Sequence, residues 1–178
     1  MTPSAQKAAD RKARRKAKAR RLNLEAGVPS RATLRAETQK LQSALNAAVR
    51  ERDGAVCISC GRTGLVVAMG GTWQAGHLFN VKTYPALRFH PLNIHSQCSQ
   101  CNSTTANRGG RMGNQAAYSA EFIRRRGLET FQALDAIKAE VRQWRILDLI
   151  ELRTVLTSGG IDAYQARYFD LTGWKVAA

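Results

Sequence analysis

Apolar residues recur at near-helical spacing in two long parts of this 178-residue chain. The first part predicts a helix from about Arg31 to Arg52. The second predicts a helix from about Leu128 to Val155, preceded by a shorter one from about Gln115 to Arg126 that ends at Gly127. The last helix would carry a stripe that is typical of core packing and could also join two subunits. Its members are Phe131, Leu134, Ile137, Val141, Trp144 and Leu147.

The segment between these helices has the pattern of short strands. Leu65–Met69 and Trp73–Ala75 are separated by Gly70-Gly71, which predicts a hairpin with His77 directly after its second strand. Asn102 is expected at the start of a short helix. Helices flanking one small sheet make the predicted class α+β.

Composition divides the predicted elements into four parts. Residues 1–29 form a basic arm, 30–52 the leading helix, 53–127 the core with all the cysteines, and 128–178 a C-terminal helical region. The length allows one domain of moderate size with an appendage, and 44% hydrophobic residues are enough for a packed core.

The net charge of +15 is unevenly distributed. Residues 1–52 carry 14 Lys or Arg against 4 Asp or Glu, and residues 53–120 carry 5 against 1. Residues 121–178 are nearly balanced, with 9 against 8. A polyanion such as DNA is therefore expected to lie against the arm and the core.

The most basic segment is Lys7–Arg21, with nine positive charges, one negative charge and no apolar residue larger than alanine. On its own, such a segment is a solvated tail, either disordered or a self-repelling helix. Beside a DNA-binding core we expect it to lie along phosphates, through residues such as Arg14, Arg15 and Lys16. A transit peptide is disfavoured because no hydrophobic face accompanies the arginines.

All four cysteines occur in two CxxC pairs, Cys57-Ile-Ser-Cys60 and Cys98-Ser-Gln-Cys101. Two such knuckles suit one tetrahedral Zn²⁺, and the ion would be structural because four thiolates leave no open position. Two disulfides are the alternative, but no apolar signal segment is present. We therefore expect a zinc protein that is not secreted and works in a reducing cytoplasm.

A histidine and two asparagines beside the cysteine pairs predict a second, catalytic site. His77 follows Gly76, and Asn93 stands nine residues before Asn102, which abuts the last cysteine. As a neutral imidazole, His77 would take the proton of an attacking water, while Asn102 would hold a divalent ion. Asn93 would tie the loop to the strand that carries His77. Separately, these residues are more typical of loop and knuckle hydrogen bonds; together, they favour catalysis.

The metal chemistry is restricted because residues 54–120 contain no Asp or Glu. A two-metal phosphodiesterase needs bridging carboxylates, so one Mg²⁺ or Mn²⁺ is expected, with the substrate phosphate supplying the missing charge. His95 could be a second ligand of that ion or contact phosphate, whereas His90 is expected at the surface or in packing. The sequence does not choose which arginine clamps the scissile phosphate. The candidates are Arg88, Arg108 and Arg111.

The cysteine pairs with His77 and the asparagines resemble the HNH arrangement of the ββα-metal nucleases. From about Ser30 to Arg153, the chain resembles the phage recombination endonucleases called NinG or Rap. The resemblance implies a zinc-stabilised HNH-like core that cuts branched DNA, such as Holliday junctions and D-loops, in the bacterial host. The motifs that carry it are Arg50-Glu-Arg-Asp53, Cys57-Ile-Ser-Cys-Gly61, Ala75-Gly-His77, Leu87-Arg-Phe89, Asn93-Ile-His95, Gln97-Cys98 and Cys101-Asn102.

Two features depart from that pattern. Gly76 stands where many HNH enzymes have a metal-binding His or Asp, and the loop Ala106–Gly113 is longer and richer in glycine. A weakly held ion and recognition by DNA shape would follow. Two alternatives remain, a non-catalytic zinc-containing DNA-binding protein and a sequence-tolerant HNH nicking nuclease. The expected partner is DNA, with no membrane, and a homodimer through the Leu134–Leu147 stripe is compatible with the pattern.

Overall fold

The computed structural model describes residues 3–25, 31–67, 72–103 and 114–174. In these residues the protein is a mostly helical α+β structure with a sheet of two strands. The elements, in chain order, are α1 (Pro3–Glu25), α2 (Arg31–Asp53), β1 (Trp73–His77), the 3-10 turns η1 (Pro85–Phe89) and η2 (Pro91–Asn93), β2 (Ile94–Cys98), α3 (Ser99–Asn102), α4 (Gln115–Arg126), α5 (Leu128–Ile137) and α6 (Ile146–Thr172).

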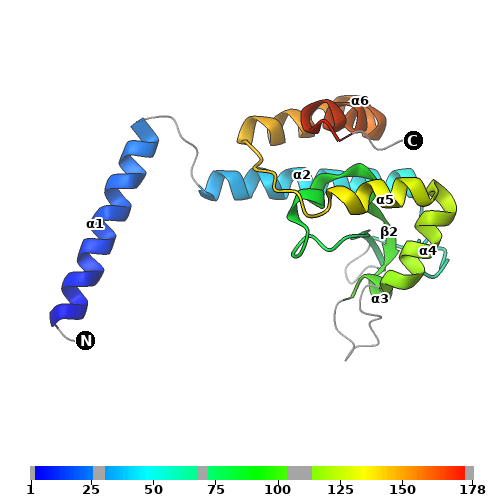
Figure 1. The fold of residues 1–178 in the computed structure, drawn as a ribbon, viewed down its shortest axis with the longest axis horizontal. Coiled ribbons are helices and arrows are strands. Elements are labelled where there is room, and N and C mark those ends of the chain that lie inside the picture. The colour runs from blue at the N-terminus through cyan, green and yellow to red at the C-terminus, as the bar shows by residue number, and fades with distance from the viewer. Residues whose placement is uncertain (1–2, 26–30, 68–71, 104–113, 175–178) are drawn as a thin grey trace.

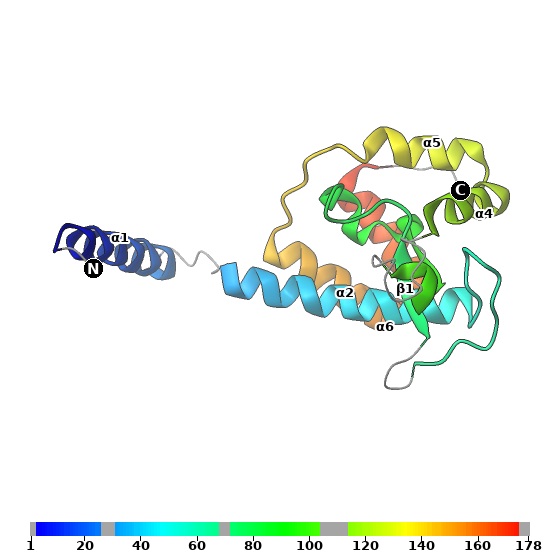
Figure 2. The ribbon, with the colours of Figure 1, turned by 90° about the horizontal axis from the view of Figure 1, so that it is seen from below.

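The main core lies between α2 and α6, which run side by side in Figures 1 and 2. The helix predicted from about Arg31 to Arg52 is confirmed as α2, and its Leu41, Leu45 and Val49 are fully buried. They pack with apolar and tyrosine side chains of α6 and with Phe89 and Ile94 from the sheet region. The leading helix and the C-terminal region therefore share one core.

A second cluster of buried side chains lies beneath α4 and α5. Tyr118 and Phe122 of α4 and Leu134 of α5 pack there against Leu87 and Leu92 from the loop region before β2. The helix predicted from about Gln115 to Arg126 is confirmed as α4, and Gly127 follows it with a positive φ of 86°. α4 and α5 together cover the loop region before β2.

The predicted single helix from Leu128 to Val155 is wrong. α5 ends at Ile137, and α6 begins only at Ile146. Between them Trp144 turns inward against Phe89 and Tyr168, which a continuous helix would not permit. Val141 and Leu147 are 91% and 74% exposed, so the proposed dimer stripe is not one continuous face.

The predicted hairpin partner of β1 is also wrong. β1 pairs antiparallel with β2, so that Gly76 lies opposite His95 and His77 lies opposite Ile94. Residues 65–67 form no strand, and residues 68–71 lie outside the described residues. Every residue of β2 is buried, whereas the run from Leu65 has only Leu65 buried, with Val66 and Val67 exposed. The N–H of Trp73 donates to the carbonyl of Val66, but residues 65–67 form no ladder with β1. His77 is consequently the last residue of β1.

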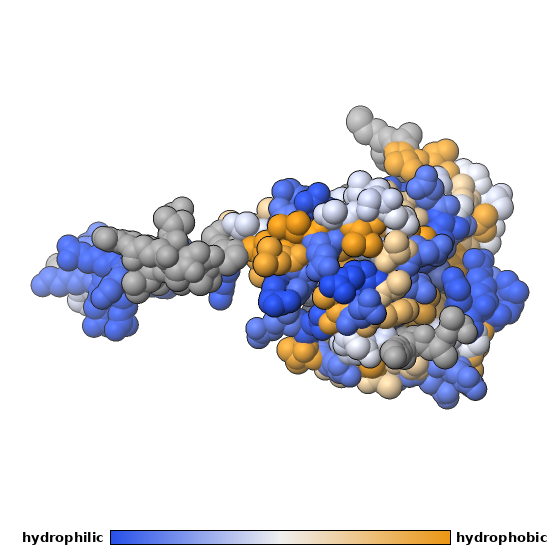
Figure 3. Space-filling view, turned by 90° about the horizontal axis from the view of Figure 1, so that it is seen from above, coloured by the Kyte–Doolittle hydropathy of each residue, from blue (hydrophilic) through white to orange (hydrophobic). Residues whose placement is uncertain are grey.

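The basic arm contains a helix, α1, whose described side chains from residue 4 to residue 18 are all exposed. Figures 1 and 2 show α1 apart from the body, and in Figure 3 its described surface is hydrophilic. Of the two states predicted for the arm, the self-repelling helix agrees with the structure. Among the described helices, none contains an apolar stretch long enough to cross a membrane.

The carboxylate of Asp53 joins the end of α2 to β2. Its Oδ2 accepts hydrogen bonds from the backbone N–H of Ser96 at 2.9 Å and from Nδ1 of His95 at 3.0 Å. Arg52 donates to both carboxylate oxygens and to the carbonyl of Ile94. Burial alone would raise the pKa of Asp53, but the bonds from His95 and Arg52 outweigh it and hold the pKa well below its usual value.

Replacing this carboxylate should strongly destabilise the fold. Asp53→Ala leaves the Ser96 N–H and the His95 ring without an acceptor, and we expect a loss of about 3 to 5 kcal/mol in unfolding free energy. Urea denaturation followed by circular dichroism measures it. Asp135→Ala is the matched control, because Asp135 forms a partly exposed ion pair with Lys138 and should contribute less than about 1 kcal/mol. Equal losses for the two variants would contradict the anchoring role of Asp53.

Candidate metal centre and histidine site

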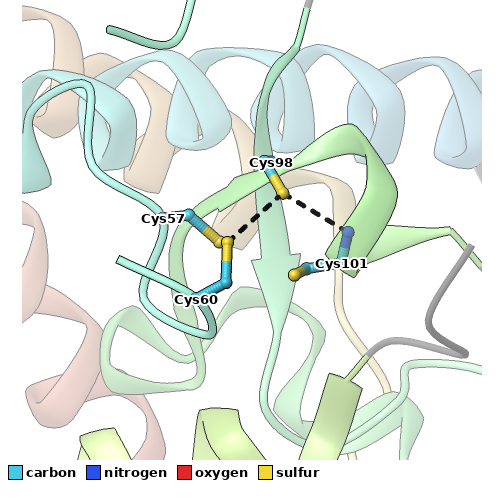
Figure 4. A group of neighbouring side chains, drawn as sticks. All are labelled: Cys57, Cys60, Cys98 and Cys101. Atoms are coloured by element: carbon cyan, nitrogen blue, oxygen red, sulfur yellow. Dashed lines mark hydrogen bonds between the residues drawn. The ribbon is translucent and has the colours of Figure 1, made fainter. Parts of the chain in front are cut away.

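The four cysteines converge from three segments, as Figure 4 shows. Cys57 and Cys60 lie in the loop after α2, Cys98 ends β2, and Cys101 lies in α3. Their four Sγ atoms are all within 4.8 Å of one another, and none is in a disulfide. The predicted alternative of two disulfides is therefore not what the structure shows.

Local hydrogen bonds shape each half of this cysteine cluster. In the first knuckle, the N–H of Cys57 donates to the carbonyl of Arg62, and the N–H of Gly61 donates to the carbonyl of Cys57. In the second, the N–H of Cys101 donates to Sγ of Cys98 at 3.4 Å. These bonds turn both sulfurs of each pair toward the same point.

The geometry and chemistry of the cluster fit Zn²⁺. Zn–S bonds of about 2.3 Å place the sulfurs of a tetrahedral site about 3.8 Å apart, and the Sγ atoms of Cys60 and Cys98 are 3.9 Å apart. Burial raises the pKa of the Cys57 thiol, and it raises that of Cys101 to about 12. A bound cation would supply the charge that these sulfurs need in order to ionise. The four cysteines could therefore hold a metal such as zinc.

His77 lies at the end of β1 with its ring mostly enclosed. Its Nε2 lies 3.1 Å from the carbonyl oxygen of Arg88, which requires Nε2 to donate. Nδ1 is then the acceptor nitrogen. Within the described part of the chain it has no hydrogen-bond partner. It is also absent from the set of buried side-chain atoms that lack a partner, so it is accessible. Burial lowers the pKa of His77 to about 4, so the ring is neutral at pH 7.

Asn93 organises the loop that supplies this carbonyl. Its Nδ2 donates to the carbonyls of Phe79 and Leu87, and its Oδ1 accepts from the N–H of Phe79. Its own carbonyl accepts from the N–H of Leu78, directly after His77. Asn93 is fully buried, so it holds both ends of the loop against β1 from inside.

Asn102, in α3, packs against the strand that carries His77 but on its other face. Its Nδ2 donates to Oε1 of Gln74 at 2.8 Å, and its Oδ1 is 3.0 Å from the position that a Cβ on Gly76 would occupy. Alternation along β1 directs His77 away from the face of Gln74 and Gly76. Asn102 ends the four-residue helix α3, so the expectation that it begins a helix is wrong.

Gln97 explains why position 76 is glycine. Its Oε1 is 1.9 Å from the site of a Cβ on Gly76, so any larger residue there would displace it. The Nε2 of Gln97 donates to Oγ of Ser59, which sets the direction of the amide. The amide oxygens of Gln97 and Asn102 thus approach the same point of β1. The sequence analysis assigned no role to Gln97. Its position directly before Cys98 was the signal that could have identified it as part of the site.

His95, predicted as a second ligand of the catalytic ion, lies opposite Gly76, and its buried Nε2 has no hydrogen-bond partner among the described residues. It is 3% exposed, its Nδ1 bonds to Asp53, and its ring packs edge-on against Tyr118 and Phe122. Burial lowers its pKa in spite of Asp53. His95 is therefore part of the interior. Sequence reasoning also missed Asp53, although it is the one carboxylate among residues 53–120.

The predicted cationic residues fall in three different places. Arg88 lines an open cleft beside η1. Arg14, Arg15 and Lys16 are exposed on α1. Arg108, Arg111 and the loop Ala106–Gly113 lie outside the described residues.

Loss of a buried cysteine should abolish folding, because the metal would link three segments that have few apolar contacts among themselves. We expect Cys57→Ser to lose both the metal and the far-ultraviolet spectrum of the folded protein. One zinc per chain should be found in the wild type by elemental analysis. Two substitutions of Cys60 form a matched pair of variants, because its exposed position leaves room for an imidazole. Cys60→His should keep the zinc that Cys60→Ser loses, and a metal-free wild type that folds normally would contradict the assignment.

Comparison with known proteins gives consistent matches. The family model described as Bacteriophage Lambda NinG protein matches residues 1–160. Protein ninG of Escherichia phage lambda is 35% identical over 131 residues, which is 65% of this chain and 58% of the relative. Protein ninG of Escherichia phage 933W is 36% identical over 99 residues, which is 55% of this chain and 44% of the relative. Protein ninG of Salmonella phage P22 is 35% identical over 108 residues, which is 60% of this chain and 46% of the relative.

The chain spans about half the length of the curated relatives that it matches. No solved structure matches it. The family model nevertheless covers residues 1–160 of the 178, including both cysteine pairs, His77 and both asparagines. This chain therefore belongs to the NinG family of bacteriophage proteins.

Proposed function

We propose that this chain is a metal-dependent DNA endonuclease with an HNH-like core, in which His77 is the general base. The observation that carries the proposal is the state of the His77 ring. Its Nε2 is occupied by the Arg88 carbonyl, its Nδ1 is open, and its lowered pKa keeps it neutral. A neutral histidine held in one tautomer, with its acceptor nitrogen accessible, is the form that a general base requires.

In the proposed reaction, Nδ1 of His77 accepts a proton from a water molecule that attacks the phosphorus atom of the DNA backbone. The Arg88 carbonyl then stabilises the imidazolium that forms, because it accepts the hydrogen bond from Nε2–H. Asn93 positions that carbonyl through its bond to the neighbouring carbonyl of Leu87 and through the loop that it organises. The ring cannot easily rotate while Nε2 keeps its hydrogen bond to the Arg88 carbonyl and Asn93 holds the loop.

The amide oxygens of Asn102 and Gln97 would hold a divalent ion. Both lie close to the Gly76 backbone, and neutral oxygen atoms are suitable ligands for Mg²⁺ or Mn²⁺. Such an ion offsets negative charge on the phosphate and on the leaving oxygen. Because the residues around it supply no carboxylate, its affinity should depend on the phosphate of bound DNA.

DNA as the substrate is supported by charge and by family. The net charge is +15, and the exposed residues 4–18 of α1 carry many cations against one carboxylate, Asp10. The resemblance to the NinG or Rap recombination endonucleases suggests branched substrates, such as Holliday junctions and D-loops. Phosphate contacts by α1 would add affinity without selecting a sequence.

Three observations favour a second candidate, a zinc-containing DNA-binding protein without catalysis. Nδ2 of Asn102 is already bonded to Gln74, and the candidate ion site has no charged ligand. This site also lies on the face of β1 opposite to the one toward which alternation directs His77. Incubating purified protein with supercoiled plasmid and with synthetic four-way junctions, with and without added Mg²⁺, tests both candidates. Metal-dependent cutting of junctions supports the proposal. Equal nicking of both DNAs indicates a sequence-tolerant nicking nuclease, and no cutting indicates a binding protein.

His77→Ala should reduce the cleavage rate by about 10²- to 10⁴-fold, the usual contribution of a positioned general base. DNA affinity and zinc content should stay the same, because His77 holds neither phosphate nor zinc in this scheme. Single-turnover cleavage of a labelled junction measures the effect. With a pKa of about 4, His77 should give the wild type a rate that is flat across neutral pH and falls below about pH 5, where the base becomes protonated.

Thr83→Ala is the matched control for this experiment. Thr83 is exposed and lies in the same loop, so its replacement should leave the rate unchanged. Cleavage by His77→Ala at the rate of Thr83→Ala would refute the role of His77.

Deleting residues 1–25, which include α1, should weaken binding to every DNA shape by a similar factor. Each phosphate contact that is lost should reduce the slope of log affinity against log salt concentration by about 0.9 on duplex DNA. The preference for a junction over a duplex should remain, since shape must be read by the folded body. Electrophoretic binding curves at several salt concentrations measure both quantities.

The triple variant Arg14→Gln, Arg15→Gln and Lys16→Gln tests charge alone, because it leaves the length of the helix unchanged. It should produce part of the same reduction in slope. If the deletion removes the junction preference while duplex affinity is kept, α1 reads DNA structure and this division of roles is wrong.

A further inference from the structure

An open cleft of about 380 Å³ lies between the start of α2, the turn η1 and the segment before α6. Its wall combines apolar and cationic side chains, and this volume lies within the range of small-ligand sites. The apolar part consists of Leu34, Pro85, Phe89 and Trp144, and the cationic part of Arg88 and Arg142. Nothing in the proposed role of His77 uses Arg142 or Trp144.

Arg142 is held in place, and neither arginine is neutralised by an ion pair among the described residues. The guanidinium of Arg142 lies 4.4 Å above the ring of Trp144, and its Nη2 donates to the carbonyl of Leu171. Trp144 is itself fixed edge-on against Phe89. Among the described residues, neither Arg88 nor Arg142 forms an ion pair with a carboxylate. A pair of cations of this kind is suited to phosphate.

We propose that this cleft binds one unpaired nucleotide of a DNA strand. Its phosphate would bind Arg88 and Arg142, and its base would lie against the apolar wall and the guanidinium plane of Arg142. Bases are bound in this way on aromatic rings and on arginine planes in single-strand recognition. A base within a duplex cannot enter a recess unless it leaves the stack, so the cleft selects unpaired positions.

Arg88 connects this cleft to the candidate catalytic residue. The carbonyl of Arg88 accepts the hydrogen bond from His77, while the same residue lines the cleft. A nucleotide in the cleft would therefore place a neighbouring phosphodiester close to Nδ1 of His77. This inference rests on the proposed function for its DNA substrate, and it assigns a physical origin to the preference for branched DNA, where unpaired nucleotides are accessible.

Binding of two labelled duplexes that differ by one extra, unpaired thymidine tests the cleft. Fluorescence anisotropy without added divalent ions measures both affinities and is independent of cleavage. The wild type should prefer the bulged duplex by about fivefold or more, since stacking one base contributes about 1 to 3 kcal/mol. Thr38→Phe should bring the ratio close to one, because Thr38 lines the cleft and phenylalanine fills it while every arginine contact remains. Arg142→Gln should also lower the ratio.

Arg124→Gln is the matched control for loss of one positive charge. Arg124 is exposed on α4 and paired with Glu121, so it should lower both affinities slightly and leave the ratio unchanged. A wild-type ratio of one, or an unchanged ratio in Thr38→Phe, overturns the proposal. Thymidine monophosphate that competes as strongly as the bulged DNA would show that the cleft serves a free nucleotide, which also overturns it. If the bulge preference holds while junctions are not cut, the endonuclease assignment fails and the cleft assignment stands.

Discussion

The candidate site depends on how β2 is anchored, because this strand has polar attachments at both ends. At its start, Asp53 binds the Ser96 N–H and the His95 ring, which fixes β2 to the end of α2. At its end, Cys98 joins the cysteine cluster and so ties β2 to the loop after α2. The pairing with β2 sets the register of β1. A sheet of only two strands is marginally stable by itself, so it needs these attachments of β2. The places of His77 and Asn102 follow from these attachments.

Burial and hydrogen bonding act together on His77. Enclosure lowers its pKa, and the bond to the Arg88 carbonyl fixes its tautomer. Asn93 provides the rigidity behind that carbonyl, since its amide satisfies three backbone groups of a loop that has no strand partner. The proposed base thus depends on a buried asparagine that need not touch the substrate.

The proposed division of labour follows from where the charges are. Residues 4–18 of α1 have many cations and no apolar residue larger than alanine, so this part can follow phosphates but cannot recognise a shape. The cleft has only two cations, but one of them, Arg142, is held by the ring of Trp144 and the carbonyl of Leu171. In this view affinity comes from the arm, and selection among DNA structures comes from the body. The proposed ion site has only neutral ligands, which would make ion binding depend on bound DNA as well.

The sequence by itself determined the features that depend on local pattern. The two CxxC pairs, the helices α2 and α4, and the concentration of charge before residue 53 are all readable because spacing and composition act over a few turns. Tertiary structure alone decided the pairing of β1 with β2, because all five residues of β2 are buried, which no local alternation indicated. It also decided the break at Trp144, whose ring packs against the distant Phe89. The inward place of His95 likewise depends on Asp53, which is far away along the chain. A periodicity shows which residues prefer burial, but it cannot show which surface will bury them.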